Sequence, residues 1–427
     1  MTKEWDVVVI GAGPAGIAAA VSAAEGGKRV CIVDDNPRPG GQIWRGAAKD
    51  ACAAAWQQRL KSAPINRLFG WHVFARPAPY VLRAESAGEC VDLSYGKLIV
   101  ATGARELFLP FHGWTLPNVM GAGALQSMVK SGLPITGKRV AVAGSGPLLL
   151  AVAAYLKQHG AQIVALCEQA PLARLVRFAS ALLGDGDKLR QAFGLAWQMR
   201  GIPFHSTTWP TAANGSDRVE SVVLRNAKRE WTIECDYLAC GFHLIPNTEF
   251  AELLGCLISE GRVAVDDMQQ TSVPDIFCAG EPTGLGGLEA ALLEGQIAGY
   301  FCAGAPEKAK RLLAQRKSMQ RFASRLANTF RLDPRLRLLA APETVVCRCE
   351  DVPFDTLQPF RNWRAAKLHT RCGMGPCQGR VCGPATQFLF GWTPSSVRAP
   401  IFPASVGSLC APVTQAPLLN KDRKENG

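Results

Sequence analysis

Residues 5–20 read WDVVVIGAGPAGIAAA, and this stretch decides the class of fold. Its first part, DVVVIG, is short, apolar and β-branched, which predicts a strand buried on both faces. A GxGxxG loop follows, in which Gly11 permits a tight turn, Gly13 lets a pyrophosphate approach the backbone, and Gly16 lets the next helix pack on the strand. Free N–H groups at that helix N-terminus favour phosphate, so the stretch predicts a dinucleotide site. The predicted contacts are Gly11, Gly13, Pro14, Ala15 and Gly16.

The next strand, RVCIVDD at 29–35, carries the acid that such a site needs. Asp34 lies 23 residues after Gly11, about where a carboxylate binds the ribose hydroxyls of a dinucleotide. Its neighbour Asp35 is an alternative for the same role. The agreement of strand, loop, helix, second strand and terminal acid favours a real site over a ligand-free glycine turn.

The size and charge of the chain limit the other possibilities. Its 427 residues exceed what one hydrophobic core usually serves, which predicts two or three domains. The formal charge of +12 is concentrated partly in 309–337 and otherwise scattered, so we expect no nucleic-acid partner. That basic segment predicts either a solvated helix or a docking surface for an acidic protein or a membrane.

The start of the chain predicts a cytoplasmic protein. Residues 5–10 already form a strand, which leaves no room for a signal peptide. The apolar stretch 140–156 is interrupted by Gly, Ser and Pro, so it does not predict a bilayer span. We expect a cytoplasmic location, with peripheral contact at the inner face of the cell membrane as a further option.

The first pattern recurs at 138–168, KRVAVAGSGPLLLAVAAYLKQHGAQIVALCE. Strand, Gly144 and Gly146, helix, strand and Glu168 follow in the same order, which indicates an internal duplication. The third glycine is replaced by Leu149, which crowds the helix against the strand and the phosphates. This unit therefore favours a retained scaffold, or a site for another nucleotide, over an NAD(P) site.

Two stretches resemble the flavoproteins that carry two dinucleotide-binding domains, the glutathione reductase and thioredoxin reductase class. They are YGKLIVATGARE at 95–106 and the strand, AGE and helix of 271–300, and PRPGGQIWR at 37–45 resembles the segment alongside the flavin. The resemblance implies an α/β fold with duplicated Rossmann-like units and an FAD whose ribityl chain is held by Glu281. The implied flavin contacts are Gly41, Gln42, Arg45, Ala101, Thr102, Gly103, Gly280, Glu281 and Gly287.

The redox-active disulfide common in that class is missing. No cysteine follows GGQIWRG at 40–46, and 116–244 contains no CxxC. We expect the isolated cysteines to be buried core thiols; they are Cys31, Cys52, Cys90, Cys167, Cys235, Cys240, Cys256, Cys278, Cys302. Electrons would therefore leave the flavin by another route.

The segment 344–384 holds five of the fifteen cysteines and offers that route. Four thiolates suit an iron–sulfur cluster or zinc, and nearby glycines would bring N–H groups close to the sulfurs of a cluster. Spacing pairs Cys347 with Cys349, and leaves Cys372 as a rival to Cys377 and Cys382. TRCGMGPCQGRVC resembles the bacterioferritin-associated-ferredoxin-like 2Fe–2S domain, which implies the ligands Cys347, Cys349, Cys377 and Cys382.

The combination of PRPGGQIWR, GSGPLLL and this tail resembles the alpha-type subunits of heteromeric amine dehydrogenases. That group includes D-hydroxyproline dehydrogenase, opine oxidase and hydrogen cyanide synthase. The resemblance implies an FAD and 2Fe–2S electron-transfer subunit, with C–N bond oxidation performed by a glycine- or sarcosine-oxidase-like partner and often a small ferredoxin-like subunit present. No catalytic residue is assigned. The alternatives are an NAD(P)H-dependent reductase and a flavin-free scaffold.

The motifs predict six segments. They are the FAD domain in two parts (1–115 and 245–305), the second Rossmann insert (116–244), a basic helical linker (306–341), the iron–sulfur domain (342–395) and a tail (396–427).

Overall fold

The structure is a computed structural model that describes residues 3–45, 50–181, 194, 197–393 and 397–413. Its internal contacts group the chain into two compact units. Unit 1 contains Met1–Gly103, Pro246–Gln320 and Ser396–Gly427, and unit 2 contains Ala104–Ile245 and Arg321–Ser395. The grouping divides the basic segment between the units and places residues 104–115 in unit 2. The six-segment division remains a prediction.

Unit 1 is built on a seven-stranded sheet in the order β3-β2-β1-β6-β5-β4, with β19 also paired to β6. The pairs around β1 are parallel, and Val9 lies opposite Ile32 on one side and Ile99 on the other. The strands are β1 (Lys3–Ile10), β2 (Val30–Asp34), β3 (Ile65–Phe69), β4 (His72–Ala78), β5 (Val81–Ser86), β6 (Glu89–Val100) and β19 (Ile276–Cys278). A separate hairpin joins β17 (Ile258–Ser259) to β18 (Arg262–Val263).

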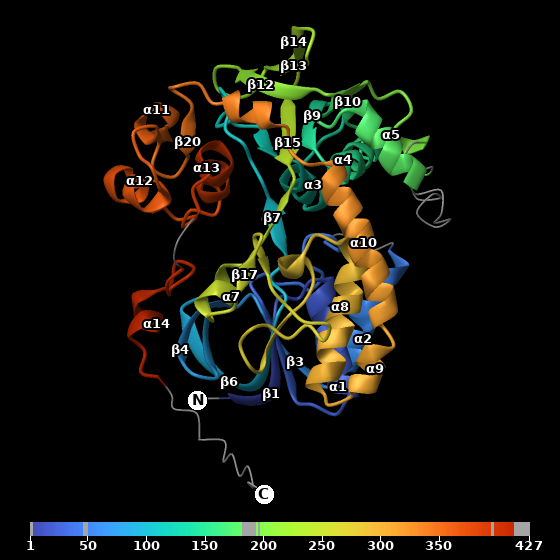
Figure 1. Cartoon of the computed structure of the whole chain (residues 1–427), viewed down its shortest axis with the longest axis vertical. Helices are drawn as coiled ribbons and strands as arrows, with labels where there is room; N and C mark the ends of the chain where they lie inside the picture. The colour runs from blue at the N-terminus through green and yellow to red at the C-terminus, as the bar shows by residue number, and fades with distance from the viewer. Residues whose placement is uncertain (1–2, 46–49, 182–193, 195–196, 394–396, 414–427) are drawn as a thin grey trace, which may run out of the picture. The chain divides into compact units, whose positions relative to one another are not determined.

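Helices α1 and α8 of unit 1 pack against each other beside this sheet (Figure 1). Their contact is close because Gly295 and Gly299 of α8 face the backbone of α1, where a side chain would collide. The helical elements are α1 (Pro14–Glu25), α2 (Ala51–Ser62), α7 (Glu249–Leu253), η1 (Glu281–Thr283), α8 (Gly287–Cys302), α9 (Pro306–Lys310), α14 (Val406–Cys410) and α10 (Leu313–Thr329), which continues into unit 2.

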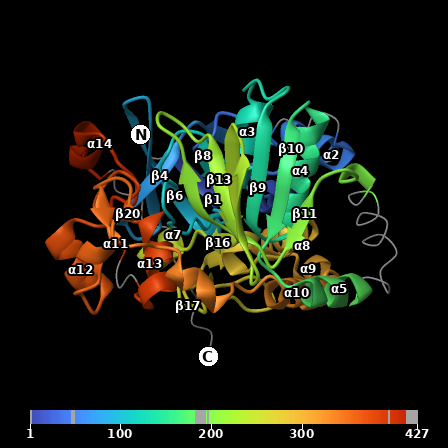
Figure 2. The same ribbon diagram turned by 90° about the horizontal axis from the view of Figure 1, so that it is seen from above.

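Unit 2 contains a five-stranded parallel sheet in the order β11-β10-β9-β15-β8, flanked by α3 and α4 (Figure 2). Its strands are β8 (Val119–Gly121), β9 (Arg139–Ser145), β10 (Gln162–Glu168), β11 (Phe204–Ser206) and β15 (Tyr237–Phe242). The antiparallel strands are β12 (Trp209–Asn214), β13 (Ser221–Arg225) and β14 (Glu230–Glu234). Two short pairs join β7 (Ala104–Glu106) to β16 (Leu244–Pro246) and β20 (Val345–Cys347) to β21 (Val352–Pro353).

The helices of unit 2 fall into two regions. Those of the sheet region are α3 (Ala122–Lys130), α4 (Pro147–Gln158) and α5 (Leu172–Ala181). Those near the cysteines are η2 (Pro334–Leu338), α11 (Phe354–Leu357), α12 (Trp363–Thr370) and α13 (Cys382–Phe390). Among the described residues of both units, no helix is long and apolar enough to cross a membrane.

The predicted fold class is confirmed, because β1-α1-β2 and β9-α4-β10 repeat one strand–loop–helix–strand pattern. Val7, Val8 and Val9 are completely buried, as the apolar run predicts for a central strand. The expectation of buried thiols is wrong for Cys52 and Cys90, which are exposed. Cys52 lies on helix α2 and Cys90 at the start of β6, where each side chain faces away from the core.

Candidate functional site

The glycine loop of unit 1 leaves open space at the N-terminus of α1. Gly13 is the N-cap residue, and no side chain caps the helix or places an acid in its first turn. A Cβ on Gly13 would meet nothing within 4 Å. The other two glycines are packed: a Cβ on Gly11 would lie 2.2 Å from the carbonyl oxygen of Ala101, and one on Gly16 would lie 1.8 Å from that of Gly11. The loop therefore combines a tight scaffold with an open face of free N–H groups.

The acid at the end of β2 lies beside this loop. Asp34 accepts a hydrogen bond from the backbone N–H of Ala12 and another, at 2.8 Å, from that of Asn36. Asp35 is exposed and binds the Asn36 side chain at 2.7 Å. Of the two predicted acids, Asp34 is the one held against the glycine loop.

The segment 37–45 also reaches the loop. Gly41 adopts φ +58° and packs so closely that a Cβ there would lie 3.0 Å from the Cα of Gly13. Arg45 is half-buried and donates to the side chain of Asn36, whereas Gln42 is exposed. This segment therefore lies along the open face of the loop.

The two remaining predicted motifs of unit 1 come together at the same end of the sheet. A Cβ on Gly103 would lie 3.8 Å from a carboxylate oxygen of Glu281, and one on Gly280 would lie 2.7 Å from the Cβ of Ala15. Thr102 is fixed by Asn247, whose backbone oxygen accepts from its hydroxyl at 2.8 Å. Gly287 is exposed at the first turn of α8.

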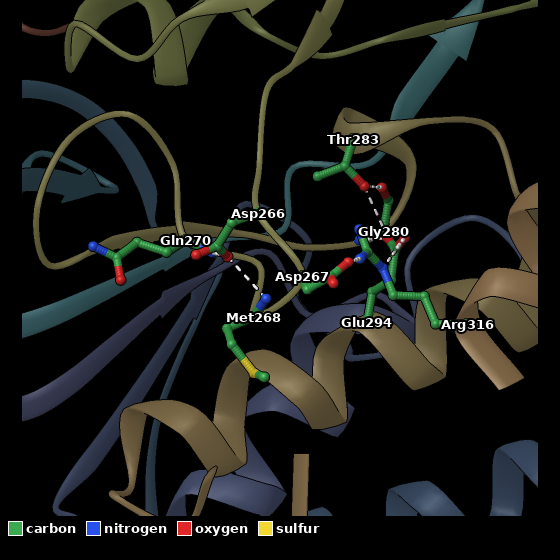
Figure 3. Close-up of polar contacts among 8 residues, drawn as sticks. All are labelled: Asp266, Asp267, Met268, Gln270, Gly280, Thr283, Glu294 and Arg316. Carbon is green, nitrogen blue, oxygen red and sulfur yellow. Dashed lines mark hydrogen bonds and ion pairs between the residues drawn. The ribbon is translucent and has the colours of Figure 1, made fainter. Parts of the chain in front are cut away.

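A buried polar network holds the turn that carries Glu281 (Figure 3). Glu294 of α8 accepts hydrogen bonds from the backbone N–H of Gly280 at 3.0 Å and the hydroxyl of Thr283 at 2.8 Å. Its other carboxylate oxygen lies 3.4 Å from the Nε of Arg316, which also approaches Asp267 at 3.5 Å. Burial raises the pKa of Glu294, and the Arg316 guanidinium opposes that rise.

Sequence reasoning missed Glu294 and Arg316. Arg316 is only 4% exposed, so one residue of the basic helix is an internal counter-charge rather than a solvated cation. The available signal was a glutamate inside the otherwise apolar helix of 287–302, since a buried acid needs a partner. The sequence does not show which distant arginine supplies it.

The corresponding loop of unit 2 is closed by the protein's own chain. The Ser145 hydroxyl donates to Glu168 at 2.9 Å and lies 3.2 Å from the carbonyl oxygen of Phe330. Gln169 also contacts this segment, because its side-chain oxygen accepts from the backbone N–H of Asp333 at 3.0 Å. The segment that follows α10 therefore covers the loop.

The two loops differ in exposure and in charge. Gly11 and Gly13 are half-exposed, whereas Gly144 and Gly146 are buried. Glu168, one methylene longer than aspartate, accepts from the backbone N–H of Gly146 at 2.8 Å, a position that a pyrophosphate would otherwise use. Burial raises the pKa of this carboxyl to about 7.

Leu149 stands where the third glycine of the motif would be and is 2% exposed. It packs in the core formed by α4 and its neighbouring strands. The residue that departs from the motif therefore contributes to packing.

Three of the five tail cysteines form a compact buried cluster, which we call the inner triad: Cys347, Cys372 and Cys382. Their sulfur atoms all lie within 4.8 Å of one another, and each side chain is at most 1% exposed. Cys347 ends β20, Cys372 follows α12, and Cys382 begins α13, so three segments of unit 2 converge here. Soft thiolates at such separations suit iron or zinc.

The other two cysteines, Cys349 and Cys377, form an outer pair. Their thiols are hydrogen-bonded to each other, and Cys377 also contacts Cys382. Cys349 is exposed and Cys377 half-buried. All four predicted ligands are thus close to one another, but the rival Cys372 is equally close.

Thiol–thiol hydrogen bonds dominate the acidity of the cluster. The bond to Cys372 lowers the pKa of Cys347, and the bond to Cys382 lowers that of Cys377 to about 5. The backbone N–H of Gly373 also donates to the sulfur of Cys347 at 3.5 Å. Such donors stabilise thiolates, which are the form that binds metal.

The glycines of this segment let the chain approach the cysteines. A Cβ on Gly373 would lie 2.6 Å from the Trp363 ring, and one on Gly375 would lie 2.3 Å from the Cβ of Cys349. Gly379 is nearly as close to the same ring, at 3.2 Å. Their positions fit the expectation that backbone N–H groups lie close to sulfur.

Comparisons with known proteins agree with this geometry. Residues 5–298 match the family described as pyridine nucleotide-disulphide oxidoreductase. The A-type component of opine oxidase from Rhizobium meliloti (strain 1021) is 30% identical, over 95% of this chain and 98% of that protein. Hydrogen cyanide synthase subunit HcnB of Pseudomonas aeruginosa is 30% identical, over 88% of this chain and 90% of that protein.

A solved structure extends the likeness in fold. The crystal structure of L-proline dehydrogenase from P. horikoshii has a TM-score of 0.68 and 17% sequence identity, and the match covers 96% of this chain and 80% of that one.

Proposed function

Because this chain belongs to the pyridine nucleotide-disulphide oxidoreductase family, we propose that it is the FAD- and 2Fe–2S-carrying electron-transfer subunit of a heteromeric dehydrogenase. The substrate class would be an amino or imino acid such as hydroxyproline, an opine or glycine. Two relatives that match most of the chain are named as subunits of an opine oxidase and a hydrogen cyanide synthase, which supports an assembly of this kind. A cytoplasmic location stays a prediction.

The observation that carries the proposal is the open loop of unit 1. The space at Gly13 fits a pyrophosphate, and the uncapped first turn of α1 offers N–H donors to it. Asp34 is placed to accept from ribose hydroxyls, and Glu281 from the ribityl chain. Glu294 and Arg316 hold the turn on which Glu281 lies. When bound, FAD would supply two-electron acceptance and one-electron release.

The cysteines of unit 2 fit an iron–sulfur cluster. Five thiols, a backbone N–H donor and close-packed glycines gather in one part of the unit. We propose Cys347, Cys349, Cys377 and Cys382 as ligands, following the resemblance of their motif. A cluster held there would accept electrons singly.

We place substrate oxidation on a partner protein similar to glycine and sarcosine oxidases, and a small ferredoxin-like protein would be a further member of the complex. The chain contains only six histidines, and its sequence offers no acid–base constellation for amine oxidation. The isolated chain is therefore expected to contain flavin and iron but not to reduce a dye with proline, hydroxyproline or opines. Dye reduction should appear when a glycine-oxidase-like partner is co-expressed.

Two outcomes would contradict this division. Turnover by the isolated chain would place the catalytic site on it, and protein without flavin absorbance would favour a scaffold. Visible spectroscopy and iron analysis of anaerobically purified protein distinguish these cases.

The rival function, an NAD(P)H-dependent reductase, would use the second loop. Because Glu168 and the segment 330–333 close that loop, we predict that NADH and NADPH leave the flavin oxidised. The measurement is anaerobic titration followed by flavin absorbance, with dithionite as the control that the flavin is reducible. Rapid stoichiometric bleaching by either nucleotide would establish the reductase instead.

A further inference from the structure

The five tail cysteines give a cluster one more thiol than it needs, and the structure shows where the extra thiol lies. A 2Fe–2S cluster takes four cysteines, two on each iron. The outer pair, Cys349 and Cys377, is hydrogen-bonded and would serve one iron. The inner triad would serve the other, so one of its three thiols is spare.

The geometry of the inner triad does not single out one pair. Two sulfur ligands of a tetrahedral metal lie about 3.8 Å apart when each metal–sulfur bond is about 2.3 Å. All three sulfur separations are within 4.8 Å, so any two thiols can close on one iron after a shift of about 1 Å or less.

Cys347 differs from the other two members in its support. It lies on β20 and receives the backbone N–H of Gly373, which neutralises part of a thiolate's charge. Cys372 and Cys382 approach from the end of α12 and the start of α13, and each contacts Cys347. Both are buried, so either would keep the iron from water.

We propose that Cys372 and Cys382 are interchangeable ligands of the inner iron, each able to complete its coordination together with Cys347. This inference rests on the proposed 2Fe–2S site. It makes Cys372 a reserve ligand, so the cluster would persist after loss of either thiol and disappear after loss of both.

The test compares Cys372→Ala, Cys382→Ala and the double variant in the full-length chain, purified anaerobically. Alanine is used because serine can itself bind iron. The readouts are iron and sulfide per chain, the visible spectrum and the EPR spectrum of the reduced protein. We expect both single variants to keep the cluster, with an altered EPR spectrum for Cys382→Ala, and the double variant to lose it. Cys410→Ala, an exposed cysteine outside the cluster, is the matched control.

The contrary results are distinct. Loss of iron in Cys382→Ala alone would show that Cys372 cannot replace it, and loss in Cys372→Ala alone would make Cys372 an obligate ligand; either refutes the inference while the cluster stands. A wild-type protein without iron would instead refute the proposed function. Circular dichroism checks folding, and the corresponding serine variant replaces any alanine variant that does not fold.

Discussion

Gly13→Val is expected to purify as folded protein that has lost its flavin. Gly13 has φ −74° and ψ −177°, a conformation open to any residue, and a Cβ there meets nothing within 4 Å. The valine side chain would instead fill the space in front of the first turn of α1. Losing about two charge-assisted hydrogen bonds to phosphate costs about 3–6 kcal/mol, or roughly 10²- to 10⁴-fold in FAD affinity.

The measurement is the flavin-to-protein absorbance ratio, followed by titration of the apoprotein with FAD. Gly407→Val is the control, because a Cβ on Gly407 also meets nothing within 4 Å and the residue lies on α14, away from the loop. Full flavin occupancy in Gly13→Val would show that FAD binds elsewhere. Substitutions of Gly11 or Gly16 cannot answer the question, since their Cβ atoms would collide with the backbone.

The second large effect is expected at the outer cysteine pair. Cys377→Ala should remove the 2Fe–2S visible and EPR signals, because the partner Cys349 would then be left without a second thiolate on its iron. Among the described residues, the inner triad is the only group of three potential metal ligands whose ligand atoms lie together, so the outer pair has no reserve. Cys349→Ala should behave in the same way.

These losses are measured as iron and sulfide per chain, with flavin content as an internal reference because the flavin loop lies in unit 1. Retention of both irons in Cys377→Ala would contradict the pairing of Cys349 with Cys377. Zinc in place of iron in the anaerobically purified wild type would contradict electron transfer through this segment.

Much of the flavin site could be predicted because its parts are local. The strand, glycine loop and helix of residues 5–25 are contiguous, and the acid at Asp34 follows one strand later. Spacing alone therefore predicts that Asp34 lies against the loop, and its contact with Ala12 agrees. The later motifs at 101–103 and 280–281 were identified by resemblance, and their proximity to each other and to the loop required the folded sheet.

The sequence by itself determined the duplicated α/β fold and the residues available for each site, because hydrophobic periodicity and glycine spacing act over short distances. Only the tertiary structure decided that Phe330 covers the second loop, that Arg316 faces Glu294, and that Cys372 lies in the inner triad. These contacts join segments separated by 185, 22 and at least 10 residues. They depend on how helices and loops pack, and side-chain packing between separate elements leaves no periodic pattern along the chain.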